Sequence, residues 1–394
     1  EQLVLWQEAP YFKVPAAGLP DGAQAQSEIS LSAAANEHEP FHLVVTPKRN
    51  FAPLSLQFSD LQGAAGTIPA RQLVYKILGY VELQNPDDST VKGLNSDPLL
   101  PEQEKTATPE QNLPFYVTVQ VPPEQPAGWY QGQISLCEEG KTVATARLRV
   151  RVRSFALPAQ PFLRNHLTGR PNKDYLKLDP RSWEEVTADF CQIRASLRIY
   201  DTMSPLPAKP ECQIQDGVLT ITDWTKFDAS VELLRSQYGV RASRFPFSLL
   251  GDNSGWFHEP PQFLKHELFT GDRPGLRYLA EYCRQFDQHV RERFPGYPFV
   301  VHMYDEPPQK VLAEVKLLFQ TIKESAPSLI MTTTKAVAEG FDFVDRWIVP
   351  LSPGHHQPEL EQAARAAGKE IWFYNWSGYL GAHNYINNRI FPWM

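Results

Sequence analysis

The sequence predicts a multidomain protein: an all-β sandwich in residues 1–158, followed in residues 159–394 by an α/β domain of the (β/α)8 TIM-barrel type. Before about Pro158, apolar residues alternate with polar ones, which is the period of half-buried strands. After it, apolar residues recur at helical spacing with short apolar runs between them, as in repeated β-α units. With 394 residues, 42% of them hydrophobic, the chain exceeds what one compact core usually holds.

Two strands of the first domain are clear from alternation. Residues 115–121 form one. In the other, apolar residues are interleaved with four arginines that must face solvent or a neighbouring domain, namely Arg147, Arg149, Arg151 and Arg153. We expect this strand to pair with residues 131–137 across a turn at 138–141. A row of arginines can also bind anions, but a solvated strand face is the simpler interpretation, and no function is assigned to it.

A long irregular stretch and a proline-rich segment organise the remainder of this half. Residues 84–112 are rich in Pro, Asp and Glu without a period, so we expect a loop that runs over the surface. The segment 155–161 contains two prolines within four residues, which stops both a ladder and a helix. The domain boundary is therefore placed there.

The second domain alternates helices with strands. Helical stripes are predicted at residues 183–193, 227–238, 276–290 and 311–322. Strands are predicted at residues 162–166, 197–201, 242–249, 298–304, 329–334, 343–349 and 370–374. No Gly-rich phosphate loop follows the first strand, which favours a barrel over an open doubly wound sheet. Seven strands leave the last barrel unit missing.

Composition excludes several classes of protein. The net charge of -7 would repel a polyphosphate, so no nucleic-acid partner is expected. No apolar run approaches the roughly 20 residues of a membrane helix, so no membrane span is predicted. The 4 cysteines form no C-x-x-C pair and lack a histidine at zinc-finger spacing; no metal, cofactor or disulfide framework is implied. The first residue is Glu1, compatible with a removed leader, and a secreted or periplasmic location is expected.

Chemistry in a barrel is carried where strands end. One predicted strand end bears two adjacent acids, Asp305 and Glu306, in the sequence Tyr-Asp-Glu-Pro-Pro. Asp is also a good helix N-cap and Pro a good first helical residue, so this pair is equally how a helix begins. Its position at the fourth strand end, beside His302 and Tyr304, favours a catalytic role.

Adjacency constrains the mechanism. Two carboxylates that flank a sugar in a double displacement stand about 5–5.5 Å apart, which neighbours in sequence can seldom achieve across a ring. They can lie on one side of it, where one protonates the leaving oxygen while the other holds a 2-acetamido group that attacks the anomeric carbon. Two close carboxylates also raise the pKa of one of them, which then stays protonated as an acid. Glu306 is assigned as the acid and Asp305 as the orienting residue.

Other residues near strand ends are candidates for sugar binding. His302 is one, although a hydrogen-bonded histidine of the barrel interior is as good an interpretation. Strand aromatics are usually core, yet a rim position suits stacking on a sugar. The substrate-binding candidates are His302, Tyr304, Trp372, Tyr374, Asn375, Trp376, Asn165 and Trp256.

These motifs resemble those of glycoside hydrolase family 123-like proteins, which are similar to β-N-acetylgalactosaminidases. The likeness rests on Asn95-Ser-Asp-Pro-Leu-Leu-Pro101, Pro126-Ala-Gly-Trp-Tyr-Gln-Gly132, Tyr304-Asp-Glu-Pro307 and Trp372-Phe-Tyr374. It implies a sandwich before a catalytic barrel, and a retaining, substrate-assisted hydrolase of glycan or glycolipid ends. By that resemblance Asp305 orients the acetamido group and Glu306 is the acid/base.

One departure keeps alternatives open. The chain stops at Met394, where the family continues through a last helix and an eighth strand. One alternative is a non-catalytic glycan-binding protein with a degenerate barrel. Another is a glycosidase of the ordinary two-carboxylate type, with its second acid at another strand end such as Asp201. The sugar, its linkage and the oligomeric state are not fixed by the sequence.

Overall fold

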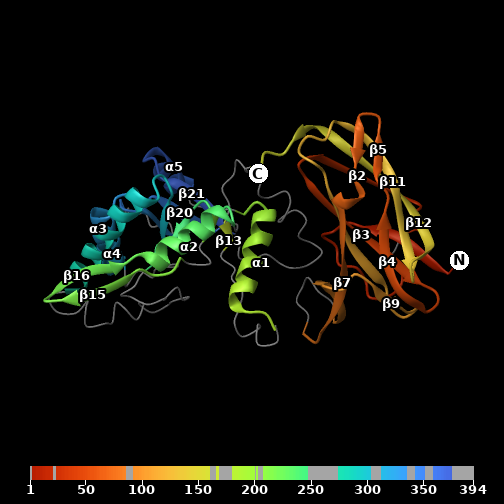
Figure 1. The fold of residues 1–394 in the computed structure, drawn as a ribbon, viewed down its shortest axis with the longest axis horizontal. Coiled ribbons are helices and arrows are strands. Elements are labelled where there is room, and N and C mark those ends of the chain that lie inside the picture. Colours follow the sequence, from red (N-terminus) through yellow and green to blue (C-terminus); the bar gives the residue numbers. More distant parts are fainter. Residues whose placement is uncertain are drawn as a thin grey trace. The chain divides into compact units, whose positions relative to one another are not determined.

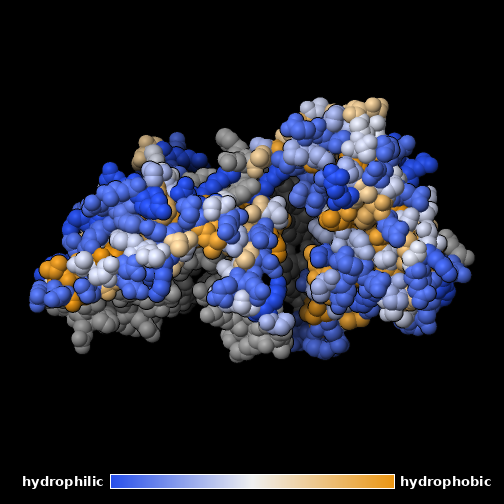
Figure 2. Space-filling model, in the orientation of Figure 1, coloured by the Kyte–Doolittle hydropathy of each residue, from blue (hydrophilic) through white to orange (hydrophobic). Residues whose placement is uncertain are grey.

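The computed structural model describes residues 2–20, 24–85, 92–159, 166–167, 180–199, 201–202, 207–246, 274–302, 312–334, 342–350 and 358–374. The chain divides into two compact units, with the division between Pro161 and Phe162. Figure 1 shows strands throughout the first unit and both helices and strands in the second. The visible surface of both units is mostly hydrophilic, with scattered hydrophobic residues (Figure 2).

The first unit contains two sheets. One has the strand order β1-β3-β10-β7-β8 and the other the order β2-β12-β11-β4-β9, with β5 and β6 attached through β11. Strands of the first sheet are β1 (Leu3–Glu8), β3 (His38–Pro47), β7 (Leu73–Leu83), β8 (Gly93–Leu100) and β10 (Leu113–Gln120). Those of the second are β2 (Glu28–Ala35), β4 (Phe51–Phe58), β5 (Leu61–Gly63), β6 (Gly66–Ile68), β9 (Lys105–Ala107), β11 (Gly128–Glu138) and β12 (Lys141–Ala156). A 3-10 turn, η1 (Ala70–Gln72), precedes β7.

Both sheets contribute to one core, which makes this unit a β-sandwich. Phe115 and Val117 of β10 share it with Leu148 and Val150 of β12, and all four side chains are fully buried. The arginines between the apolar residues of β12 face away from that core, as alternation requires. The predicted pairing across residues 138–141 is confirmed, since β11 and β12 are antiparallel neighbours.

The prediction of an irregular loop over residues 84–112 is wrong for much of its length. β8 pairs with β7, and β9 pairs with β4. Each of these two strands lies at the end of its sheet's strand order. An edge strand tolerates prolines and charges that a central strand excludes, so β8 can include Pro98 in its sequence without losing its ladder.

A buried histidine gives the sandwich a predictable response to acid. His42 of β3 is 3% exposed, and burial, aided by Lys13, lowers its pKa from 6.5 to about 4. In the unfolded chain His42 binds a proton below pH 6.5, whereas in the folded chain it does so only near pH 4. The free energy of unfolding therefore falls as the pH drops from 6.5 to about 4, and His42 does not change it above pH 6.5. This shift in the pKa of His42 corresponds to roughly 3 kcal/mol in the free energy of unfolding.

We expect His42→Phe to remove this part of the acid sensitivity while keeping an aromatic ring beside Tyr116, whose centroid lies 5.5 Å from that of His42. Urea unfolding of the wild type and the variant at pH 7 and pH 4 measures it. The free energy of unfolding of the variant should drop less between the two pH values, by roughly 3 kcal/mol. An equal drop in both proteins would show that His42 does not cause it.

The second unit is built on parallel strands in sequential order. Its main sheet has the order β17-β18-β19-β20-β21, and β13 pairs in parallel with β14, which lies against β17. The strands are β13 (His166–Leu167), β14 (Asp201–Thr202), β17 (Ser243–Arg244), β18 (Phe299–His302), β19 (Ile330–Thr333), β20 (Arg346–Pro350) and β21 (Glu370–Tyr374). A doubly wound sheet reverses its order at a switch point, whereas this order only advances, so the unit is barrel-like.

The helices described in this unit are α1 (Trp183–Ser196), α2 (Thr225–Ser236), α3 (Pro274–Arg293), α4 (Leu312–Ser325) and α5 (Pro358–Ala366). Residues of α2, α3 and α4 share one hydrophobic core with strands of the sheet and so cover one of its faces. Phe286 of α3 and Phe319 of α4 share a core with Phe299 and Val301 of β18. Cys283 lies in the same core, and Cys191 of α1 is also buried, so both thiols are packing residues.

The stripe predicted for α1 is wrong at one position. Ile193 is 58% exposed, and the buried residues of this helix are Val186, Cys191 and Arg194. An arginine can take an apolar place because its long aliphatic stem packs while its head keeps polar partners. Burial lowers the pKa of Arg194. The sequence pattern counted the isoleucine as core because it weighs only residue type.

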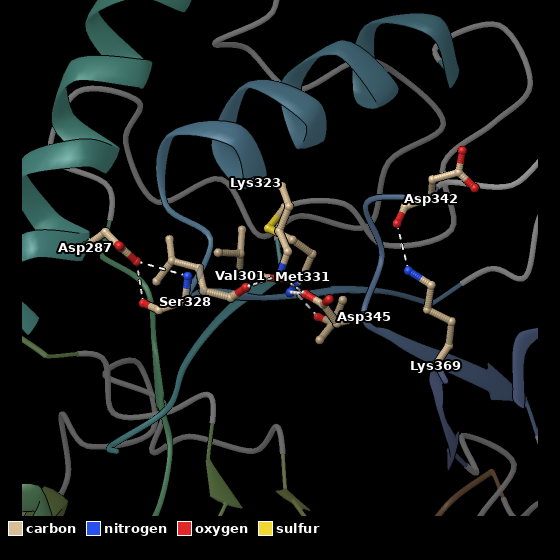
Figure 3. A network of polar contacts seen from close by, with 10 residues as sticks. Asp287, Val301, Lys323, Ser328, Met331, Asp342, Asp345 and Lys369 are labelled. Carbon is tan, nitrogen blue, oxygen red and sulfur yellow. Dashed lines mark hydrogen bonds and ion pairs between the residues drawn. The ribbon is translucent and has the colours of Figure 1, made fainter. Parts of the chain in front are cut away.

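A polar network fixes α4 to the amino ends of two strands (Figure 3). Lys323 Nζ donates to Asp345 Oδ2 at 2.7 Å and to the carbonyl of Leu329 at 2.9 Å. The same aspartate oxygen accepts from the backbone N–H of Met331, and Asp287 of α3 accepts from Ser328. Polar groups at this end of a barrel serve stability, whereas chemistry is found at the carboxyl ends.

Candidate active site

The face of the parallel sheet opposite the helices carries a row of polar side chains. Residues alternate between the two faces, so Val301 and Met331 point to the helices and their neighbours to the other side. Cross-strand pairs connect His302, Thr332, Arg346 and Glu370, hereafter the polar row. The row is oblique, because His302 ends β18 whereas Arg346 and Glu370 begin β20 and β21. It therefore runs from the carboxyl end of β18 to the amino ends of β20 and β21.

His302 is held by a hydrogen bond that determines its tautomer. The residue is 9% exposed, and its Nδ1 lies 2.9 Å from Thr332 Oγ1. The Thr332 hydroxyl donates its one proton to the carbonyl of Val301 at 3.1 Å, so its oxygen accepts from Nδ1–H. A neutral His302 thus carries its proton on Nδ1, which makes Nε2 the acceptor nitrogen of the ring.

A neighbouring strand fixes the backbone at the same point. Arg244 of β17 donates from Nη2 to the carbonyl of His302 at 2.9 Å. The carboxyl end of β18 is thereby bound on both sides, by Arg244 and by Thr332. The chain therefore leaves β18 from a residue that is held by both neighbouring strands. Such a fixed position is what a catalytic group needs from its scaffold.

Arg346, Glu370 and Trp372 form the second polar cluster of this face. Arg346 is 2% exposed; its Nε donates to Glu370 Oε2 at 2.8 Å, and Trp372 Nε1 donates to the same oxygen at 2.9 Å. The guanidinium carbon of Arg346 stands 3.9 Å from the Trp372 ring centroid. One face of the indole is covered by this contact.

The structure places two of the predicted site residues in detail. His302 and Trp372 point from the same face of the sheet, on strands separated by β19 and β20. Tyr374 ends β21 and Asp201 begins β14, and for both the description is of the backbone alone. The other predicted site residues lie outside the described residues: Asp305, Glu306, Tyr304, Asn375, Trp376, Asn165 and Trp256.

Four polar residues of this face were not predicted as part of the site: Arg244, Thr332, Arg346 and Glu370. Their sequence signal is a polar residue inside or at the start of a short apolar strand. Arg346, for example, immediately precedes the apolar run 347–349. A buried charge in such a place implies a partner, but the sequence does not say which strand supplies it.

Several classes of site are not found among the described residues. Over that part of the chain, no group of three or more His, Cys, Asp or Glu residues is arranged to hold a metal ion. All four cysteines are described and are free thiols. Within the same ranges, no helix is long and apolar enough to cross a membrane.

Two adjacent threonines allow the His302 hydrogen bond to be tested. We expect Thr332→Val to destabilise the protein by about 1–3 kcal/mol, because the buried Nδ1–H loses its acceptor. Thr333→Val is the matched control: the Thr333 hydroxyl is buried without a hydrogen-bond partner among the described residues, so its removal should leave stability unchanged or raise it. Denaturant unfolding compares the two. Equal losses would mean that the hydrogen bond contributes nothing specific.

Compared by sequence, the chain matches no protein-family model and no curated protein. Compared by structure, it is similar to a family 123 glycoside hydrolase from Clostridium perfringens, studied for the hydrolysis of glycolipid glycans, with a TM-score of 0.68 and 10% identity. The alignment covers 96% of this chain and 73% of that one. A family 39 glycoside hydrolase from Bacteroides cellulosilyticus WH2 aligns at 12% identity over 88% of this chain and 66% of that one, but its TM-score of 0.29 is too low to support an argument. The chain has the fold of the first enzyme, a β-rich unit followed by a barrel-like unit.

Proposed function

We propose that the protein is a retaining glycoside hydrolase that removes a terminal β-linked N-acetylhexosamine, with N-acetylgalactosamine as the preferred sugar, from a glycan or glycolipid. The observation that carries the proposal is the position of the acid pair in the chain. β18 ends at His302 in the middle of the parallel sheet, and Asp305 follows three residues later. Chain connectivity keeps the Asp305 Cα within about 11 Å of the His302 Cα. The fold shared with an enzyme of glycolipid glycan hydrolysis supports the same assignment.

The proposed reaction needs one proton donor and one orienting carboxylate. Glu306 donates a proton to the glycosidic oxygen while the carbonyl oxygen of the 2-acetamido group forms a bond to the anomeric carbon and the leaving group departs. Asp305 accepts a hydrogen bond from the acetamido N–H and stabilises the cyclic cation that forms. Water then opens this intermediate, with Glu306 taking the proton, and two inversions give retention.

The described residues support the proposed reaction in two ways, at the end of β18 and on β21. His302 and Arg244 fix the strand end from which the pair departs. Trp372, held by Arg346 and Glu370, is the proposed platform for the sugar. We include His302, Tyr304, Trp372, Tyr374, Asn375, Trp376, Asn165 and Trp256 in the proposed substrate-binding set.

The test is release of p-nitrophenol from the β-N-acetylgalactosaminide, β-N-acetylglucosaminide and β-galactoside, together with inhibition by a thiazoline analogue of the cyclic intermediate. We expect turnover of the acetamido sugars alone, fastest for the galacto form, and competitive inhibition by the thiazoline. Turnover of the β-galactoside would instead support an ordinary two-carboxylate glycosidase, in which Asp201→Asn abolishes activity. Glycan binding without turnover of any substrate would identify a binding protein with a degenerate barrel.

A further inference from the structure

The outer face of the sandwich presents an ordered grid of polar side chains. It is formed by β2, β12 and β11, on the side of the sheet away from the core residues Leu148 and Val150. Paired residues across the three strands form three rows, hereafter the arginine face. The rows are Glu28–Arg147–Gln133, Ser30–Arg149–Gln131 and Ser32–Arg151–Trp129. Residues two apart on a strand are about 6.6 Å apart, so the arginines stand at regular intervals.

This face is positively charged on an acidic chain. Three arginines and one glutamate give it a formal charge of +3 - 1 = +2, whereas the whole chain carries -7. Glu28 lies 3.6 Å from Arg147 and 3.1 Å from Arg149. Arg151 forms no ion pair with any residue in the described part of the chain, and it is exposed. Arg151 therefore presents a cationic hydrogen-bond donor that no acid among the described residues neutralises.

Trp129 adds an exposed aromatic ring to the same face. It is 47% exposed, whereas the next residue of β11, Tyr130, is fully buried. The guanidinium carbon of Arg149 lies 4.5 Å from its ring centroid, and Arg151 is its cross-strand partner. The indole is thus held by cationic neighbours while much of its surface remains open.

We propose that the arginine face binds an acidic glycan whose charges are carboxylates. The planar guanidinium of Arg151 fits a carboxylate through two parallel hydrogen bonds. The indole of Trp129 suits the apolar face of a sugar ring, and the amides of Gln131 and Gln133 complement its hydroxyl groups. The chain's overall negative charge disfavours the denser charge of a nucleic acid.

This surface does not rest on the proposed catalysis. It lies in the first compact unit, whereas Asp305 and Glu306 belong to the second. Loss of hydrolysis would leave it intact, and loss of glycan binding at this face would leave hydrolysis of a small p-nitrophenyl substrate unchanged. The two proposals can therefore fail separately.

The probe is a galacturonic acid oligosaccharide, compared with the same oligosaccharide fully methyl-esterified, which keeps the sugar rings and removes the charge. Calorimetry or thermophoresis with the full chain should show binding of the acid form, weakened by added salt, and binding of the ester at least about tenfold weaker. Trp129→Ala and Arg151→Ala should each weaken binding of the acid form about five- to tenfold.

Arg71→Ala is the matched control, because Arg71 is an exposed arginine of η1 in the same unit. It should bind as the wild type does, and Arg71→Ala and Arg151→Ala should keep the wild-type thermal midpoint because both side chains are exposed. Absence of binding to the acid form, equal binding of acid and ester, or equal weakening by Arg71→Ala would each overturn the proposal. Tighter binding of an RNA oligonucleotide, lost in the same two variants, would overturn it in favour of a nucleic-acid surface.

Discussion

Glu306→Gln is expected to lower kcat/KM for a disaccharide substrate by about 10²–10⁴-fold. The amide keeps the size and the hydrogen-bonding capacity of the side chain, but it has no proton to give to the leaving oxygen. A p-nitrophenolate leaves without much protonation, so the loss for the p-nitrophenyl substrate should be smaller than for a natural linkage. This dependence on the leaving group identifies a general acid, because a merely structural change slows all substrates alike.

The control for this variant is Glu184→Gln, the same chemical change at an exposed position in the first turn of α1. It should retain wild-type kinetics on both substrates. If Glu306→Gln kept full activity, or lost it equally on good and poor leaving groups, Glu306 would not be the acid. The helix-start interpretation of Asp-Glu-Pro-Pro would then be the better one.

Much of the fold follows from local patterns because burial imposes them locally. The alternation in β12 and the helical spacing in α3 and α4 are set by which side chains face the core. Each pattern can be recognised in a stretch of sequence no longer than about two helical turns. The order of parallel strands also follows from repeated β-α units, since successive strands tend to be neighbours. These elements were predictable with no knowledge of the rest of the molecule.

The elements that were missed are a short hairpin and two edge strands. In the hairpin, β15 (Glu211–Gln215) has no fully buried residue, and β16 (Val218–Asp223) buries only Leu219 and Ile221. Its turn was nevertheless readable: Asp216 and Gly217 both adopt positive φ, of 51° and 74°, and Asp-Gly is a strong hairpin signal. β8 and β9 were missed for the related reason that sheet edges accept polar residues and proline.

The contacts of the candidate site residues could not be predicted from the sequence. His302 and Trp372 were proposed from their places near strand ends, yet Thr332 and Arg346, which contact them, come from other strands through a register that no local pattern encodes. Thr332 decides the tautomer of His302, and Arg346 packs against one face of the Trp372 ring. Both effects depend on residues far away in sequence: Thr332 is 30 positions from His302, and Arg346 is 372 - 346 = 26 positions from Trp372.

Asp305→Asn is expected to lower turnover of acetamido substrates by about 10²–10³-fold, the usual cost of losing one group that stabilises charge in the transition state. The asparagine can still accept a hydrogen bond, but it no longer opposes the positive charge of the cyclic intermediate. Because that intermediate forms with every leaving group, the loss should be similar for the p-nitrophenyl substrate and for the disaccharide. This distinguishes Asp305 from Glu306 in a single set of kinetic measurements.

Inhibition by the thiazoline tests the role of Asp305 independently of turnover. It mimics the cyclic intermediate, so its Ki should rise in Asp305→Asn by about the factor by which kcat/KM falls, since affinity for such an analogue follows stabilisation of the transition state. If Ki were unchanged while activity fell, Asp305 would act elsewhere in the reaction. If activity survived and Asp201→Asn abolished it, the adjacent pair would not be catalytic and the acids would lie on separate strands.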